Sequence, residues 1–144
     1  LDGIIIRAYS HSDVEELANN ASIPVINALT DMYHPCQGIA DIFTIKEKKG
    51  RIRNIRIGYL GDGNNVCHSL MLGSVMSKAN IVIACPHGYE PETEVYEAAK
   101  EIAVSDMVSP LLSCKSLELR YNDFPFNLLI ATSKETLVLV DGFS

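Results

Sequence analysis

The chain has 144 residues, a net charge of −6 and an apolar share of 47%, which together are typical of one globular domain in solution. The acidic balance argues against nucleic acid as a partner, because phosphate backbones are bound by basic faces. No apolar run approaches the roughly 18 residues that cross a bilayer, so the sequence predicts no membrane segment.

The first expected elements are a strand, a helix and a second strand. Residues 4–6 are three isoleucines, a β-branched run typical of a buried strand. Ser12 and Glu15 have the spacing of a capping box, so we expect Ser12 to cap the helix that follows. Residues 24–28 then read as the next strand.

A second helix is expected from Pro35, because proline costs no hydrogen bond in a first helical turn. Ile39, Ile42 and Phe43 have helical spacing and predict its apolar stripe. The basic, glycine-containing segment 46–53 follows and predicts a domain boundary. Its lysines and arginines indicate a solvated linker more than a phosphate site.

Beyond residue 54, strands and helices alternate. Residues 55–60 and 80–85 read as strands, and helices are expected around residues 70–76 and 91–104. This alternation favours an α/β fold with largely parallel sheets. Two later runs, at 128–131 and 137–140, also look like strands, whereas residues 109–126 resist assignment and residues 105–135 have no functional interpretation.

Polar side chains follow the expected strands at the edge where ligands bind in open α/β sheets. Arg7 follows the first strand, His34 and Gln37 share one face of a helix start, and Asn65 follows a later strand. An arginine beside a helix N-terminus can hold a phosphate or carboxylate. Each residue also has an ordinary structural role: a surface ion pair for Arg7 and a helix cap for His34.

Two other kinds of site are disfavoured. Gly61 and Gly63 resemble the start of a dinucleotide-binding fingerprint, but Val66 occupies the third glycine position. The four cysteines contain no close pair, so neither a zinc site nor a redox dithiol is indicated. We expect reduced thiols at Cys36, Cys67, Cys85 and Cys114, no metal and no organic cofactor.

Several segments together resemble ornithine carbamoyltransferases, members of the aspartate/ornithine carbamoyltransferase family, over residues 1 to about 97. The matching segments are Ile6-Arg7-Ala8-Tyr9-Ser10-His11-Ser12-Asp13, residues 21–31, His34-Pro35-Cys36-Gln37, Gly61-Asp62-Gly63-Asn64-Asn65-Val66-Cys67-His68-Ser69 and Gly88-Tyr89-Glu90-Pro91. The aspartate-using relatives share His-Pro-x-Gln but not, typically, the Gly-Asp-Gly-Asn-Asn form. The resemblance implies two Rossmann-like α/β halves: residues 1–46 as the second half of a carbamoyl phosphate domain with its linking helix, and residues 47–144 as the first part of an ornithine domain.

The resemblance further implies transfer of a carbamoyl group from carbamoyl phosphate to the side-chain amine of L-ornithine, giving L-citrulline and phosphate. Arg7 and His34 match catalytic ligands of carbamoyl phosphate, and Gln37 matches a third ligand. Asn65 matches an ornithine ligand, and Asp141, in a faint match at residues 140–144, would hold the α-amino group. The family implies a homotrimer for the intact enzyme, with the assembly of this piece left open, and a cytoplasmic location, or the mitochondrial matrix in an animal.

The family's Ser-x-Arg-Thr and His-Cys-Leu-Pro loops are absent from these 144 residues, and the chain opens at Leu1 in a strand-like run. We therefore expect a piece of a longer protein, with no useful turnover by itself. Two alternatives stay open: a carbamoyltransferase for another amine such as putrescine, and a non-catalytic module that binds an anion or a partner.

Overall fold

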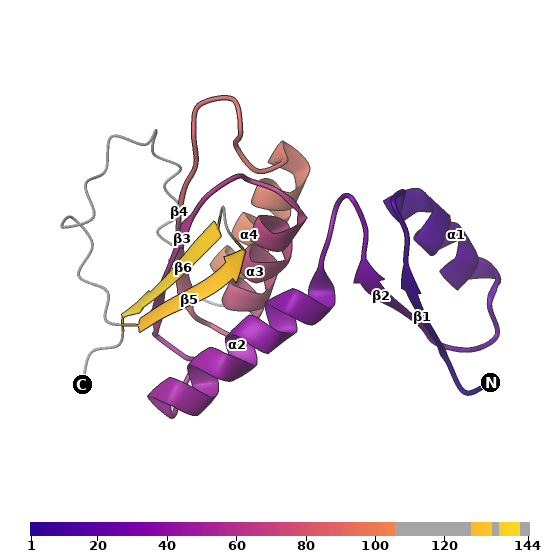
Figure 1. The fold of residues 1–144 in the computed structure, drawn as a ribbon, viewed down its shortest axis with the longest axis horizontal. Helices are drawn as coiled ribbons and strands as arrows, with labels where there is room; N and C mark the ends of the chain where they lie inside the picture. The colour runs from indigo at the N-terminus through magenta and orange to yellow at the C-terminus, as the bar shows by residue number, and fades with distance from the viewer. Residues whose placement is uncertain (106–127, 134–135, 142–144) are drawn as a thin grey trace.

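The computed structural model describes residues 1–105, 128–133 and 136–141 of the chain. Two groups of strands are joined by one long helix, α2, which runs diagonally between them (Figure 1). The elements in chain order are β1 (Ile4–Arg7), α1 (His11–Asn20), β2 (Val25–Leu29), α2 (Pro35–Lys49), β3 (Arg56–Leu60), α3 (Asn65–Met76), β4 (Asn80–Ala84), α4 (Thr93–Ser105), β5 (Leu128–Ser133) and β6 (Thr136–Asp141).

The alternation of strands and helices confirms the predicted α/β class. β1 pairs with β2 in parallel, and β3 pairs with β4 in parallel. The two late apolar runs are strands as expected, but β6 is antiparallel to both β3 and β5, which gives the larger sheet the order β4-β3-β6-β5. An antiparallel pair needs only a short connection, so β5 and β6 can follow one another directly.

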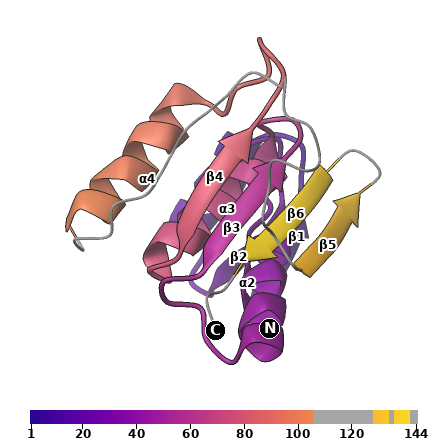
Figure 2. The same ribbon diagram turned by 90° about the vertical axis from the view of Figure 1, so that its left-hand side faces the viewer.

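The core lies between the larger sheet and its helices. Ile57 and Tyr59 of β3 and Ile81 and Ile83 of β4 are fully buried, and α3 lies behind these strands (Figure 2). α3 itself is buried around most of its circumference, as its apolar composition predicts. The smaller β1–β2 pair is different, because Ile5 and Ile26 face each other in register and remain 72% and 48% exposed.

The predicted cap of α1 is wrong by two residues. Ser10, not Ser12, is the N-cap, and its Oγ accepts a hydrogen bond from the Asp13 backbone N–H at 3.2 Å. The Ser12 hydroxyl instead lies 2.7 Å from the Ser10 hydroxyl. Both serines precede acidic residues at plausible spacing, so the local pattern alone could not choose between them.

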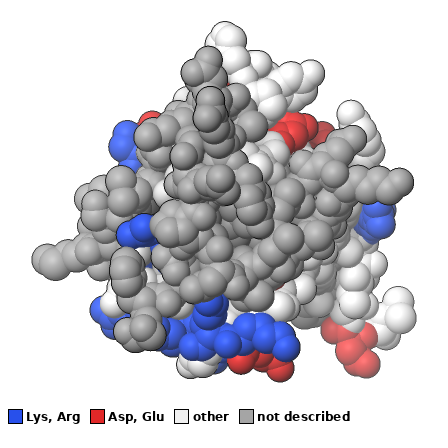
Figure 3. All heavy atoms as spheres, turned by 60° about the vertical axis from the view of Figure 1, so that its left-hand side comes forward, with Lys and Arg blue, Asp and Glu red and all other residues white. Residues whose placement is uncertain are grey.

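α2 begins at Pro35 as predicted but continues through Lys49, further than the expected break at residue 46. Gly50 ends it with φ of 71°, a left-handed conformation that glycine adopts without steric cost. The last turn of the helix contains three lysines, whose positive charges interact favourably with the negative end of the helix dipole. Figure 3 shows Lys and Arg side chains gathered at the lower margin of the molecule, where α2 ends in Figure 1.

The predicted apolar stripe of α2 is confirmed at Ile42, which packs against the core, but is wrong at Ile39 and Phe43. Ile39 and Phe43 are 70% and 58% exposed, and the buried positions are Gly38, Asp41 and Ile45. The helix face that carries Gly38 packs closely against α3. A Cβ at Gly38 would lie only 3.0 Å from the carbonyl oxygen of Ser69. The exposed side lines an open, apolar cavity of about 670 Å³ between α2 and α3.

Candidate functional site

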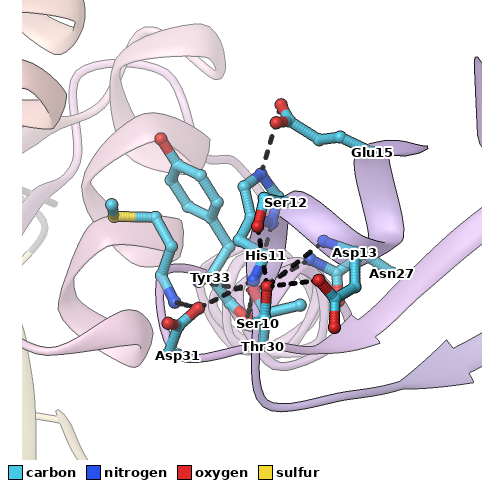
Figure 4. Close-up of polar contacts among 10 residues, drawn as sticks. Ser10, His11, Ser12, Asp13, Glu15, Asn27, Thr30, Asp31 and Tyr33 are labelled. Carbon is cyan, nitrogen blue, oxygen red and sulfur yellow. Dashed lines mark hydrogen bonds and ion pairs between the residues drawn. The ribbon is translucent and has the colours of Figure 1, made fainter. Parts of the chain in front are cut away.

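A tight turn at residues 30–33 connects β2 to the start of α2 (Figure 4). Thr30 is fully buried at its centre. Its Oγ accepts hydrogen bonds from the Tyr33 backbone N–H at 3.1 Å and from the Asn27 side-chain amide at 3.3 Å. Its own backbone N–H donates to the Tyr33 carbonyl at 2.8 Å. These bonds close the turn and set the direction in which the chain enters α2.

The start of α1 supports the same turn. The carboxylate of Asp31 accepts hydrogen bonds from the backbone N–H groups of His11 and Met32, at 3.0 and 2.9 Å. The His11 ring packs edge-on against the Tyr33 ring, with its Nδ1 3.2 Å from the Thr30 hydroxyl and its Nε2 3.6 Å from Glu15 (Figure 4). His11 is therefore a structural residue of this turn rather than a free loop histidine.

His34 is the N-cap residue of α2, but its side chain forms no capping hydrogen bond. Its backbone N–H donates to Ser69 Oγ at 2.8 Å, which fixes this position against α3. Burial lowers the pKa of the His34 imidazole, the nearby Arg7 guanidinium lowers this pKa further, and a backbone hydrogen bond with Ala28 opposes both effects. The lowered pKa favours the neutral form of the imidazole. The cation near it is the guanidinium of Arg7, the last residue of β1.

Gln37 lies on the first turn of α2 and is half-buried. Its Nε2 donates to Asp41 Oδ1 at 2.9 Å, one helical turn further on. Asp41 is only 2% exposed, and its second carboxylate oxygen is buried with no hydrogen-bond partner in the structure. Burial raises the pKa of Asp41, and the hydrogen bond from Gln37 offsets part of this effect. Asp41 is not among the site residues predicted from the sequence, although its four-residue spacing from Gln37 puts the two side chains on one face of the helix.

One face of α3 holds the turn in place. The side-chain amide of Asn65 donates to the Thr30 carbonyl at 2.7 Å, and Nδ1 of His68 lies 2.8 Å from the Met32 carbonyl. With Ser69, these residues have the helical spacing that puts them on one side of α3. Nε2 of His68 accepts a hydrogen bond from the Glu92 backbone N–H at 3.0 Å. His68 therefore joins the turn to the loop before α4.

The turn between β3 and α3 explains the glycine-asparagine motif. Asn64 caps α3, because its Oδ1 accepts hydrogen bonds from the backbone N–H groups of Val66 and Cys67 at 3.0 and 3.3 Å. Gly63 donates its N–H to the Tyr89 carbonyl at 2.8 Å, and a Cβ at this position would clash with the backbone of Pro91. Packing against the neighbouring loop therefore accounts for this glycine without a dinucleotide.

Asp141 does not join this group. It ends β6 and pairs with Arg56, the first residue of β3, whereas Asn65 follows the last residue of β3. The five-residue strand spans roughly 13 Å at about 3.3 Å per residue, so the two positions lie at opposite ends of it. Of the five predicted site residues, Arg7, His34, Gln37 and Asn65 gather around the start of α2.

Other features of the described residues bear on cofactors and membranes. Cys36 is an exposed free thiol, Cys67 and Cys85 are buried, and Cys114 lies outside the described residues. Within the described ranges, no group of three His, Cys, Asp or Glu residues is placed to hold a metal ion. No described helix has the length and apolarity needed to cross a membrane.

The gathered residues combine an arginine, a neutral imidazole and an amide at a helix N-terminus. Such donors hold the oxygens of an anionic group, and the dipole of the helix favours negative charge at that end. The arrangement, at the carboxyl ends of β1 and β2, is typical of an α/β ligand site.

Comparison with known proteins agrees with this class of site. Residues 1–47 match the family model of the aspartate/ornithine carbamoyltransferase carbamoyl-P binding domain, and residues 53–120 match that of the Asp/Orn binding domain. The chain belongs to the aspartate/ornithine carbamoyltransferase family.

Particular relatives are ornithine carbamoyltransferases. The chain is 56% identical over 103 residues to that of Oceanobacillus iheyensis, covering 72% of this chain and 32% of the relative. It is 48% identical over 129 residues to that of Bacillus subtilis, covering 85% of this chain and 40% of the relative. The solved ornithine carbamoyltransferase of Pyrococcus furiosus superposes with a TM-score of 0.75 at 47% identity, over 79% of this chain and 36% of that one. The chain thus spans about a third to two fifths of the length of these relatives.

Proposed function

We propose that this chain supplies three carbamoyl phosphate ligands, Arg7, His34 and Gln37, and one ornithine ligand, Asn65, of an ornithine carbamoyltransferase. The observation that carries the proposal is the meeting of three segments: the end of β1 with Arg7, the start of α2 with His34 and Gln37, and the start of α3 with Asn65. The names of the relatives support ornithine as the acceptor.

In the reaction, the side-chain amine of ornithine attacks the carbonyl carbon of carbamoyl phosphate. A carbon–nitrogen bond forms, the carbon–oxygen bond to the phosphate breaks, and the amine loses a proton. Negative charge builds on the carbonyl oxygen, and donors fixed in advance around that oxygen stabilise it. Arg7 and the neutral His34 imidazole are such donors in this proposal, and Gln37 holds the carbamoyl amide. Phosphate and L-citrulline are the products.

The proposed division of labour follows the two family matches. Residues 1–46 would form the second half of the carbamoyl phosphate domain with the linking helix, and residues 47–144 the first part of the ornithine domain. The matches at 1–47 and 53–120 support this boundary. Asn65 would bind ornithine with its amide, although its Nδ2 is here bonded to Thr30. Asp141 is not among the proposed ligands, because it pairs with Arg56 at the end of β3 remote from Asn65.

A homotrimer for the intact enzyme and a cytoplasmic location complete the proposal. The exposed free thiol of Cys36 supports a reducing compartment. Light scattering on the purified chain tests whether these 144 residues carry the subunit interface: a mass three times the calculated 15.8 kDa would show that they do, and a mass of 15.8 kDa that they do not.

Thermal unfolding with single ligands tests the function. A ligand that binds only the folded state stabilises it, by about 2.7 kcal/mol at 100 times its Kd. We expect carbamoyl phosphate to raise the Tm, and the Arg7→Gln variant to lose most of this shift because the guanidinium holds the anion. The control is Arg53→Gln, an exposed arginine outside the site, which should keep the shift.

Other outcomes of the same measurement contradict the proposal. Stabilisation by NAD with none by carbamoyl phosphate would favour a dinucleotide site. Stabilisation by putrescine but not ornithine, both with carbamoyl phosphate present, would favour the other carbamoyltransferase. No response to carbamoyl phosphate at all would leave a non-catalytic module as the better description.

A further inference from the structure

Asp41 is a buried carboxyl that the proposed reaction does not use. It lies in the middle of α2, 2% exposed, on the face turned toward α3. Aspartate is seldom buried to this extent unless a partner compensates the loss of hydration. The hydrogen bond from Gln37 Nε2 involves one carboxylate oxygen, and the other is buried with no hydrogen-bond partner. Packing alone would be served better here by an apolar residue, so the carboxyl calls for a different explanation.

The chemistry of the Gln37 side-chain amide explains why a carboxyl is placed at residue 41. A glutamine side chain carries an acceptor oxygen and a donor NH₂ group, and the two ends are nearly equal in shape. An ionised carboxylate only accepts hydrogen bonds. Asp41 therefore selects the orientation in which Nε2 of Gln37 points inward along α2, with Oε1 directed away from the carboxylate. The hydrogen bond is charge-assisted, so this selection is stronger than a neutral partner would give.

We propose that Asp41 is a positioning residue, which orients the Gln37 amide so that its Oε1 accepts a hydrogen bond from the NH₂ of the carbamoyl group. This inference rests on the proposed function. In the reverse orientation, the NH₂ groups of Gln37 and of the substrate would face each other and could not bond. Asp41 thus determines discrimination between carbamoyl phosphate and acetyl phosphate, which has a methyl group in place of the NH₂.

The Asp41→Asn variant separates positioning from a merely structural role. Asparagine has nearly the same shape, but its own amide can either accept from Gln37 or donate to it, so the orientation of Gln37 is no longer selected. Removing a buried charge also relieves a desolvation cost, so this variant should fold at least as stably as the wild-type chain at neutral pH. A structural role predicts that all ligands respond alike, whereas positioning predicts a loss confined to carbamoyl phosphate.

The experiment measures the Kd of carbamoyl phosphate, acetyl phosphate and inorganic phosphate for the wild-type chain and Asp41→Asn, by NMR titration. The productive orientation of Gln37 should be about half populated in the variant, so we expect carbamoyl phosphate to bind about twofold more weakly, with the other two ligands unchanged. The matched control is Glu47→Gln, which neutralises an exposed carboxylate on the same helix and should leave all three values unchanged.

A second measurement needs no substitution of Asp41. The side-chain NH₂ signals of Gln37, assigned by their loss in Gln37→Leu, should be protected from solvent exchange in the wild-type chain before any ligand is added. Signals that become protected only when carbamoyl phosphate binds would mean that Nε2 faces the ligand, and would overturn the inference.

The outcomes distinguish this inference from the proposed function. If the wild-type chain binds none of the three ligands, the proposed function fails and the inference fails with it. If the chain prefers carbamoyl phosphate over acetyl phosphate and Asp41→Asn keeps that preference, the inference alone fails. A wild-type chain that binds carbamoyl and acetyl phosphate equally also contradicts the inference, because Gln37 would then not read the NH₂ group.

Discussion

The protonation state of His34 depends on its neighbours. Burial is the main reason that the pKa of its imidazole is lowered, and the charge of Arg7 is the second. A histidine whose pKa is lowered in the folded state favours folding while it is neutral. That contribution is present above the ordinary histidine pKa and is lost as the pH falls through the lowered one. The two residues are therefore coupled even before a ligand arrives.

The Arg7→Gln variant should raise the pKa of His34 toward its ordinary value, because a like charge is removed. The rise should be partial, since burial persists. Imidazole carbon and nitrogen shifts followed by NMR from pH 4 to pH 8, the range in which histidine titrates, give the value directly. Arg53→Gln removes the same charge elsewhere and should leave the titration unchanged. A His34 pKa that does not move in Arg7→Gln would show that the two side chains do not interact.

At the level of elements, the turn at residues 30–33 sets the entry of the chain into α2. Thr30 Oγ accepts hydrogen bonds from within the turn and from β2, and the carbonyl of Thr30 accepts one from α3. The turn thus connects both groups of strands. The geometry of the turn determines where His34 lies, because His34 directly follows the turn in the chain.

Thr30→Val keeps the shape of the side chain but removes its hydroxyl, leaving buried N–H groups of Tyr33 and Asn27 without their partner. We expect a loss of about 1–3 kcal/mol in the free energy of unfolding, measured by urea denaturation. Thr44→Val is the control, because the Thr44 hydroxyl only donates to the Ala40 carbonyl of its own helix and should cost little. Equal losses in the two variants would contradict a special role for the turn.

The contact of the β3–α3 turn with the loop before α4 depends on the absence of a side chain at Gly63. Gly63→Ala places a Cβ against the backbone of Tyr89, Glu90 and Pro91, which cannot move aside as a flexible side chain would. Overpacking of this kind costs about 1–3 kcal/mol, measured as a fall in Tm and in urea midpoint. Gly73→Ala is the matched control: its Cβ would meet Ile42 at an ordinary 3.4 Å, and alanine favours the helix.

For the whole molecule, the buried carboxyl of Asp41 makes stability depend on pH. Its pKa is raised in the folded state, so its protonated form favours folding. Its contribution is fully present below the ordinary aspartate pKa and is lost as the pH rises through the raised value. This sign is opposite to that of His34 and of most carboxylates.

The difference in unfolding free energy between Asp41→Asn and the wild-type chain isolates this contribution. We expect the variant to gain stability over the wild type as the pH rises from about 4 to 7, because only the wild type must then hold a buried charge. Urea denaturation at each pH gives the difference. Glu47→Gln, at an exposed position, should run parallel to the wild type. A difference that does not change with pH would mean that Asp41 titrates normally.

Much of this architecture could be predicted from local pattern. The isoleucine run of β1, the alternation of strands and helices, and Pro35 at the start of α2 all follow from preferences that act within a few residues. The four-residue motif at His34 and the glycine-asparagine turn before α3 identified the family, because short loops with several specified residues carry more information than apolar stripes do.

Only the tertiary structure decided which side of α2 is buried. Ile39 and Phe43 have the right spacing for a core stripe, yet the close approach of Gly38 to Ser69 turns the opposite face inward and encloses Asp41. The antiparallel addition of β6 and the remote position of Asp141 were likewise beyond local pattern. Spacing along one segment specifies which residues share a face. Burial of that face depends on a partner some thirty residues away, and that choice is made only when the helices pack.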